Sequence, residues 1–240
     1  MLLVTNGRVI TRDADNAYLE NGAVAIDGEK IAEVGDATAL AGKYPEAEVV
    51  DAHGGVIMPG LVNCHTHIYS GLASGLAIKG CNPPHFLENL EQQWWKIDDN
   101  LTLDGTRASA YATVLDSLRD GVTTIFDHHA SFCEIPGSLF AIKDVCEETG
   151  IRACLCYETS DRRGPEKRDQ SIAENAEFAQ WAAKQDSGMI AAMFGGHATF
   201  TLSDETMDKM AEANNGLTGF HIHVCEGMND VWDSRQKRGG

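Results

Sequence analysis

Short apolar runs separated by turn-forming dipeptides fill the first 57 residues. Between the runs stand Asn6-Gly7, Asn21-Gly22 and Asp27-Gly28, dipeptides that favour tight hairpin turns. We therefore predict a small antiparallel β unit over residues 1–57. A sheet of so few strands needs a second layer to bury its apolar face. The apolar runs occupy residues 2–4, 7–10, 22–26, 30–34 and 49–50.

From residue 58 the pattern changes to helices that alternate with single strands. Ala108, Tyr111, Ala112, Leu115 and Leu118 recur at helical spacing and predict a helix that starts near residue 102 and runs to residue 120. The glycine at position 121 ends this helix, and a β-branched strand follows at residues 122–126.

The same alternation continues to the end of the sequence. A capping box formed by Ser171 and Glu174 is expected to open one helix, and Ser203 to cap the next. Residues 161–169, which are rich in charge, are expected to form a loop. Counting the strand before residue 65, five strand-to-helix units over residues 58–240 predict an α/β fold with a parallel sheet of (β/α) barrel type. The other elements are expected at residues 138–149 (helix) and 152–156, 189–194 and 219–224 (strands).

Two histidines two positions apart follow the first strand of this second region. A bend at Pro59-Gly60 leads into the strand that carries His65 and His67. Side chains at this spacing lie on one face of a strand, roughly 7 Å apart, so both imidazoles can converge on one metal ion. Alone, such a pair is more common as ordinary strand residues, because a metal site needs three or four ligands.

The last predicted strand supplies a third candidate ligand. Alternation sends Phe220, Ile222 and Val224 to one face and the histidines at 221 and 223 to the other. His223 lies nearer the carboxyl end, where barrel enzymes keep their chemistry, whereas His221 is expected to be a hydrogen-bonded interior histidine. Glu226 falls where the strand gives way to a loop, so its carboxylate can act as a general base or be a solvated loop acid.

Composition limits the function classes. The chain has 240 residues, of which 43% are hydrophobic and 23% charged, as in an ordinary globular protein. A formal charge of −17 repels phosphate backbones, so nucleic acid is not expected as a partner. No apolar stretch reaches membrane-span length and no secretion signal is visible, so neither a membrane nor export is expected. Seven cysteines without a framework spacing favour reduced thiols and a cytoplasmic location.

Four segments, in this order, resemble the amidohydrolase superfamily, in the branch of metal-dependent heterocycle deaminases (aminohydrolases) and triazine-type chlorohydrolases. The resemblance implies a (β/α)8 TIM-barrel-type metal-dependent hydrolase. Here the barrel is truncated to about five βα units (residues 58–240) and follows the N-terminal half of a small β-sandwich (residues 1–57). The segments are GLVNCHTH (60–67), GVTTIFDHH (121–129), GHA (196–198) and HIHVCE (221–226).

The resemblance also implies roles for single residues. Glu226 corresponds to the acid/base residue and His197 to a position that faces the substrate. Binuclear relatives need a lysine at the end of the fourth strand, which here ends in Phe-Gly-Gly-His, so one metal ion is expected. Three further pocket candidates, expected to be structural or at the rim, are His128, His129 and Trp94. The implied metal ligands are His65, His67 and His223.

The implied reaction is hydrolytic deamination of a small nitrogen heterocycle. A divalent metal ion, Zn²⁺ with Fe²⁺ as the alternative, lowers the pKa of its water towards ~7. Glu226 takes the water proton and passes it to a ring nitrogen or the leaving group. The activated water attacks the ring carbon that bears the amine, and ammonia leaves.

Two alternatives stay open on the same residues. The protein could be a chlorohydrolase or an amidase on this scaffold, or a catalytically inactive fragment that serves as a binding module. Family members carry another histidine on the sixth strand and a metal-binding aspartate on the eighth, neither of which falls in this sequence, so we expect it to be part of a longer chain. Relatives are commonly dimers, so a homodimer is one expectation, although the sequence alone does not determine the oligomeric state.

Overall fold

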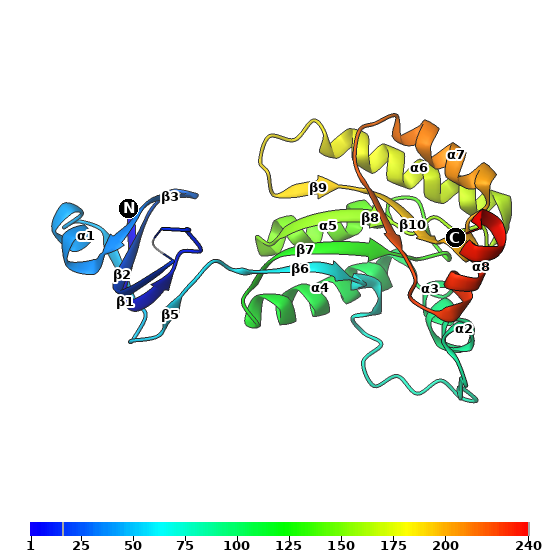
Figure 1. The fold of residues 1–240 in the computed structure, drawn as a ribbon, viewed down its shortest axis with the longest axis horizontal. Coiled ribbons are helices and arrows are strands. Elements are labelled where there is room, and N and C mark those ends of the chain that lie inside the picture. Colours follow the sequence, from blue (N-terminus) through cyan, green and yellow to red (C-terminus); the bar gives the residue numbers. More distant parts are fainter. Residues whose placement is uncertain (16, 240) are drawn as a thin grey trace. The chain divides into compact units, whose positions relative to one another are not determined.

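The chain forms two compact units, Met1–Gly60 and Leu61–Gly240, which are described here one at a time. The structure is a computed structural model that describes residues 1–15 and 17–239 (Figure 1). Among these residues, no helix combines the length and the apolar character that a bilayer crossing requires.

A five-stranded sheet and one helix make up the N-terminal unit. Strands β1 (Leu2–Ile10), β2 (Tyr18–Asp27) and β3 (Lys30–Asp36) are antiparallel, as predicted. The prediction of a wholly antiparallel unit is wrong for β4 (Glu48–Asp51) and β5 (Val56–Ile57), because both pair in parallel with β1. Helix α1 (Ala37–Lys43), which the sequence pattern did not predict, starts at the cap Asp36 and buries Leu40 against Leu3 and Ala23.

Two of the three predicted hairpin turns lie inside strands. Gly28, with φ of +59°, does turn the chain between β2 and β3. Asn6 instead has φ of +56° within β1, at a register shift typical of a β-bulge. Gly22 lies within β2, and a Cβ atom there would come within 2.4 Å of the Val9 side chain. These asparagine–glycine pairs therefore allow a bulge and a close strand approach.

The second unit contains five strand positions, counting β9 and β10, which only Met193 separates, as one. The strands pair in parallel, and the prediction of a partial (β/α) barrel is confirmed. One sheet has the order β6-β7-β8-β9 and a second pairs β10 with β11. The predicted strand over residues 189–194 is wrong as one piece, because Met193 interrupts it. A bridge between Thr159 and Gly196 continues the pairing from β8 to β10. The strands are β6 (Leu61–Thr66), β7 (Val122–His129), β8 (Arg152–Tyr157), β9 (Ile190–Ala192), β10 (Phe194–Ala198) and β11 (Phe220–His223).

A helix follows each strand position. Ser203 caps α7, as predicted, and Thr102 caps α4 at the predicted helix start; in each case the side-chain oxygen accepts a backbone N–H. The long helices are α4 (Leu103–Arg119), α5 (Ser138–Thr149), α6 (Gly164–Ala182), α7 (Asp204–Asn214) and α8 (Met228–Arg238). The short ones are η1 (Ile68–Ser70), α2 (Phe86–Asn89), η2 (Leu90–Trp94), α3 (Trp95–Asp98) and η3 (Thr199–Thr201).

Helix α6 starts earlier than the sequence pattern indicated. It begins at Gly164, with Pro165 in its first turn, so the predictions of a loop over residues 161–169 and of a helix start at Ser171 are wrong. Ser171 is buried within the helix and its hydroxyl donates to the Arg168 carbonyl at 2.7 Å. Glu174 accepts from backbone N–H groups at the start of α5, so this apparent capping box makes a tertiary contact instead.

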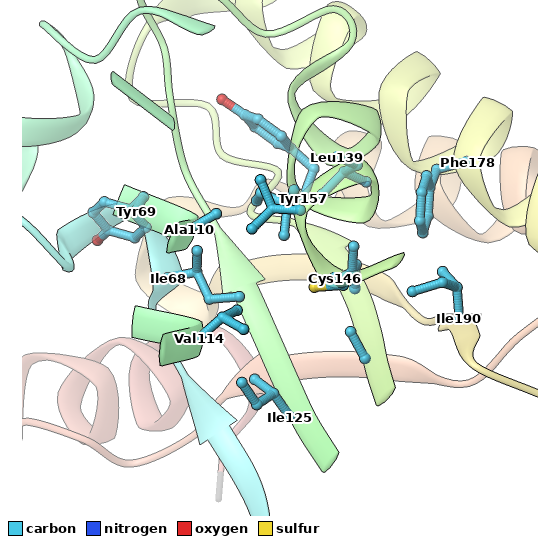
Figure 2. Packing of buried hydrophobic residues seen from close by; sticks show 14 of the residues in the cluster. Ile68, Tyr69, Ala110, Val114, Ile125, Leu139, Cys146, Tyr157, Phe178 and Ile190 are labelled. Atoms are coloured by element: carbon cyan, nitrogen blue, oxygen red, sulfur yellow. The ribbon is translucent and has the colours of Figure 1, made fainter. Parts of the chain in front are cut away.

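The core of the second unit lies between the sheet and helices α4, α5 and α6. Ile125 of β7, Val114 of α4, Leu139 of α5 and Phe178 of α6 are fully buried in one cluster (Figure 2). Burying each such side chain stabilises the folded state by about 1.5–3 kcal/mol. Because this face of the strands is apolar, the polar side chains of the same strands lie on the opposite, concave face.

Candidate metal centre and active-site pocket

Three histidines from the first and last strand positions converge. His65 lies on β6, His67 directly follows it, and His223 ends β11. Their ring centroids are 4.9 Å (65 to 67), 5.0 Å (65 to 223) and 5.2 Å (67 to 223) apart. The curvature of the strands thus brings together side chains that are 156 residues apart in the sequence.

Backbone carbonyls fix how two of these rings present their nitrogens. His67 Nδ1 lies 2.7 Å from the carbonyl oxygen of His128, and His223 Nδ1 lies 2.9 Å from that of His197. Since a carbonyl only accepts, each Nδ1 carries a proton and donates, and each neutral ring keeps a lone pair on Nε2. The two Nε2 atoms face each other at 3.3 Å. Two lone pairs in this position cannot bond to each other, but they can share a cation.

The donor set fits a zinc ion. Tetrahedral Zn–N bonds of about 2.0–2.1 Å place two nitrogens about 3.3 Å apart, as found between His67 and His223. One ligand atom from each of these residues and from His65 lies within 4.8 Å of the others. Desolvation lowers the pKa of His67, and desolvation with the neighbouring imidazoles lowers the pKa of His65 to about 4. Neutral imidazole is the form that binds metal.

One pocket is lined by His67 and His223 of this centre and by the predicted site residues His197 and Glu226. Glu226 is exposed in the loop between β11 and α8 and lines the pocket, as does His197 of β10. His65 does not appear among the lining residues. The residues that line the pocket are His67, Tyr69, Phe86, Leu90, Trp94, Trp95, Glu158, His197, His223 and Glu226.

His197 presents one nitrogen to this pocket. Its Nδ1 lies 2.6 Å from the Thr201 hydroxyl, which in turn donates to the Ala198 carbonyl at 3.1 Å. The hydroxyl therefore accepts from Nδ1–H, and Nε2 keeps its lone pair. Desolvation lowers the pKa of His197 to about 4, so the ring is neutral at physiological pH.

Three further histidines of the second unit make hydrogen bonds of their own. His221 Nε2 lies 2.9 Å from His65 Nδ1, and its own Nδ1 lies 3.6 Å from Cys156 Sγ. His128 is fully buried and its Nε2 donates to the Gly196 carbonyl at 3.0 Å. His129 is also fully buried, and its Nε2 pairs with the Ser131 hydroxyl at 2.9 Å.

Sequence reasoning missed one pocket carboxylate, Glu158. It directly follows β8, at the carboxyl end of the strand, and that position was the signal that could have found it. Its oxygens lie 3.3 Å from His128 Nδ1, 3.8 Å from His197 Nε2 and 3.5 Å from Arg162 Nη2. Although burial opposes ionisation, the Arg162 guanidinium favours the ionised form, and the pKa of Glu158 lies well below its usual range.

The chain belongs to the amidohydrolase family. Residues 56–240 match the family described as "Amidohydrolase family". Residues 22–47 match a second family, described as "Imidazolonepropionase-like composite domain, bacteria". The predicted resemblance to the amidohydrolase superfamily is thereby confirmed.

Curated relatives are named as deaminases. The chain is 31% identical over 240 residues to a 5'-deoxyadenosine deaminase from Methanosarcina barkeri, a match that covers 99% of this chain and 52% of that protein. It is 30% identical over 235 residues to a 5-methylthioadenosine/S-adenosylhomocysteine deaminase from Desulforudis audaxviator, covering 96% of this chain and 50% of that protein. The chain thus spans about half the length of these relatives.

Solved structures share the fold. Atrazine chlorohydrolase from Arthrobacter aurescens TC1, complexed with zinc, superposes with a TM-score of 0.80 at 22% identity, covering 100% of this chain and 56% of that one. Guanine deaminase from E. coli superposes with a TM-score of 0.79 at 20% identity, covering 98% of this chain and 56% of that one. At these identities the comparison supports the fold alone, a partial TIM-type barrel with an N-terminal β part.

Proposed function

We propose that this chain carries the metal-binding half of an aminohydrolase that deaminates a small nitrogen heterocycle. The observation that carries this proposal is the pair of Nε2 lone pairs, on His67 and His223, that face each other at 3.3 Å in a pocket also lined by Glu226. Membership of the amidohydrolase family and the deaminase names of the relatives support the choice of reaction.

His65, His67 and His223 would hold one divalent ion. Zinc is proposed because the donors are imidazoles at tetrahedral spacing and because a structural neighbour is complexed with zinc. Iron is the alternative, since imidazole suits both metals. When bound, the ion supplies water of lowered pKa, near ~7, to the pocket.

The residues of the chain would move the proton and orient the ring. Glu226, within the same pocket, takes a proton from water and returns it to a ring nitrogen or to the departing amine, which leaves as ammonia. The Nε2 of His197 accepts a hydrogen bond from the substrate. Trp94, Trp95 and Tyr69 offer aromatic surface on which a flat heterocycle stacks.

Ammonia and chloride release from one panel of compounds tests the reaction. The natural protein, loaded with zinc, is assayed with aminopurines, pterins, aminopyrimidines and amino- and chlorotriazines. The proposal predicts ammonia release that His223→Ala abolishes. Chloride release alone would favour a chlorohydrolase, and neither product from a zinc-loaded protein would favour a binding module; both contradict deamination.

A control variant separates loss of the site from loss of any histidine. His53 lies in the N-terminal unit with 85% of its side chain exposed and φ of +50°. Asparagine tolerates this left-handed conformation, so His53→Asn should keep both zinc and activity.

We also propose a cytoplasmic location, supported by seven free cysteines. A homodimer stays a prediction, for which the mass in solution is the measurement.

A further inference from the structure

We propose that Glu158 and His197 form an acceptor pair that binds an N–H donor of the substrate and thereby selects amine-bearing heterocycles. This inference rests on the proposed function and names its substrate class. The geometry points to it through two hydrogen-bond acceptors that lie 3.8 Å apart and both line the pocket.

Glu158 has acceptor capacity that its protein contacts leave unfilled. A carboxylate can accept about four hydrogen bonds. Among the described residues, one hydrogen bond within the usual geometric limits reaches this side chain, from Arg162 Nη2 to Oε1, and it is long, at 3.5 Å. His128 Nδ1 lies 3.3 Å from Oε2, but the proton of that neutral ring is on Nε2, which donates to the Gly196 carbonyl. Only 4% of the Glu158 side chain is exposed, so bulk water does not donate hydrogen bonds to the remaining acceptor sites of the carboxylate. A buried carboxylate in this condition gains from a donor that the pocket brings to it.

His197 cannot be that donor. Its proton lies on Nδ1, which the Thr201 hydroxyl engages at 2.6 Å, so Nε2 faces Glu158 as a second acceptor. The 3.8 Å separation is too long for a direct hydrogen bond between the two groups. An amino group, which has two N–H bonds, can donate one to each acceptor.

The charges around the pocket favour the same class of ligand. Its described lining contains two carboxylates, Glu158 and Glu226, and neither lysine nor arginine. Arg162 lies behind Glu158, where it also pairs with Asp98 at 2.6 Å. The Glu158 side of the pocket therefore suits heterocycles that bring N–H donors to it.

Equilibrium binding in a variant with strongly reduced turnover tests this pair. The dissociation constants of adenine, an amine, and of purine, its desamino analogue, are measured by calorimetry on the zinc-loaded Glu226→Gln protein. We expect adenine to bind about 10- to 100-fold more tightly than purine. Adding Glu158→Gln should reduce that ratio several-fold, and Glu158→Met should bring it near one.

Asp98→Asn is the matched control. Asp98 is a buried acid that pairs with the same Arg162 but does not line the pocket. If Glu158 acts only through the fold, Asp98→Asn and Glu158→Gln should lower the melting temperature alike and leave the binding ratio unchanged. An unchanged ratio in both Glu158 variants, or an equal fall in the Asp98 variant, would overturn the proposal.

The test of the acceptor pair and the test of the proposed function can fail independently of each other. Failure of the natural protein to release ammonia from any amine would refute deamination, whereas the binding ratio is measured in a variant with strongly reduced turnover. Ammonia release together with a ratio insensitive to Glu158 would refute the acceptor pair alone.

Discussion

Two of the candidate ligand rings depend on backbone carbonyls that belong to other histidines. His128 and His197 each contribute a carbonyl that orients a candidate ligand ring, and each also extends its own imidazole towards Glu158. Hydrogen bonds of this kind fix the tautomer of a ligand and raise its basicity. A change in the backbone at either position would therefore disturb the ligand and the pocket together.

Replacing the proposed proton-transfer residue should separate catalysis from metal binding. Glu226→Gln is expected to lower kcat by about 10²- to 10⁴-fold, because the amide cannot take a proton from water. The zinc content, measured by mass spectrometry, should stay unchanged, since the three imidazoles remain. Glu212→Gln, an exposed acid on α7, is the control and should change neither quantity. Full activity in the Glu226 variant would contradict the assignment.

At the scale of elements, one side chain of α6 joins two strands. Asn175 accepts from the N–H groups of Tyr157 and Gly195, at 2.8 and 3.1 Å, and donates to their carbonyls at 2.7 and 3.3 Å. It thereby replaces ladder hydrogen bonds between β8 and β10, in the region where the sheet is interrupted. A Cβ atom on Gly195 would come within 2.2 Å of the Tyr157 oxygen, so this approach requires glycine.

Removing this amide should destabilise the second unit. Asn175→Ala leaves several buried backbone groups without partners, and we expect the free energy of unfolding to fall by about 3 kcal/mol in urea titration. Gln180→Ala removes an exposed amide from the same helix and should cost less than about 0.5 kcal/mol. Similar losses in the two variants would show that the bridge contributes little.

The ion pair between Arg107 of α4 and Asp144 of α5 should contribute less to stability at acid pH. Lys143, at 2.7 Å, and Arg107, at 3.3 Å, lower the pKa of Asp144 from 3.8. A lowered carboxyl pKa gives stability that is present above 3.8 and is lost as the pH falls through the folded-state value.

Asp144→Asn measures that contribution. Because the Asp144 side chain is 48% exposed, solvent screening limits the loss at pH 7 to about 0.5 kcal/mol. The difference from the natural chain should shrink as the pH falls below 3.8. A difference that persists at the lowest pH where both chains fold would contradict the ion-pair explanation.

Local rules predicted the elements whose ends are set locally. Thr102 and Ser203 cap their helices, and Gly150 ends α5 with φ of +76°, because these positions are governed by neighbours in sequence. The predicted ligand residues meet for a similar reason, since strand alternation fixes the face on which His65 lies.

Tertiary contacts decided what the sequence pattern missed. The carboxylate of Glu174 caps a different helix, so the capping-box spacing gave the wrong helix start. Asn175 has no local signature, because its partners lie 18 and 20 residues away. Glu158 stands out only when His128 and His197 are seen beside it.

At the scale of the whole molecule, metal binding should couple to stability. The three proposed ligands lie on or directly after the first and last strands of the second unit, so a bound ion would link β6 to β11. A ligand present at 100 times its dissociation constant stabilises the folded state by about 2.7 kcal/mol. We therefore expect zinc to raise, and a chelator to lower, the melting temperature of the natural chain, and expect no such shift in His67→Ala. An equal shift in that variant would place the ion elsewhere.

The number of zinc ions that the metal-free protein takes up tests the central claim most directly. Equilibrium dialysis against zinc, read out by mass spectrometry, should give one ion per natural chain and one for His53→Asn. The double variant with His67→Ala and His223→Ala should give none. No bound zinc in the natural chain, or one ion retained in the double variant, would contradict a centre built from these imidazoles.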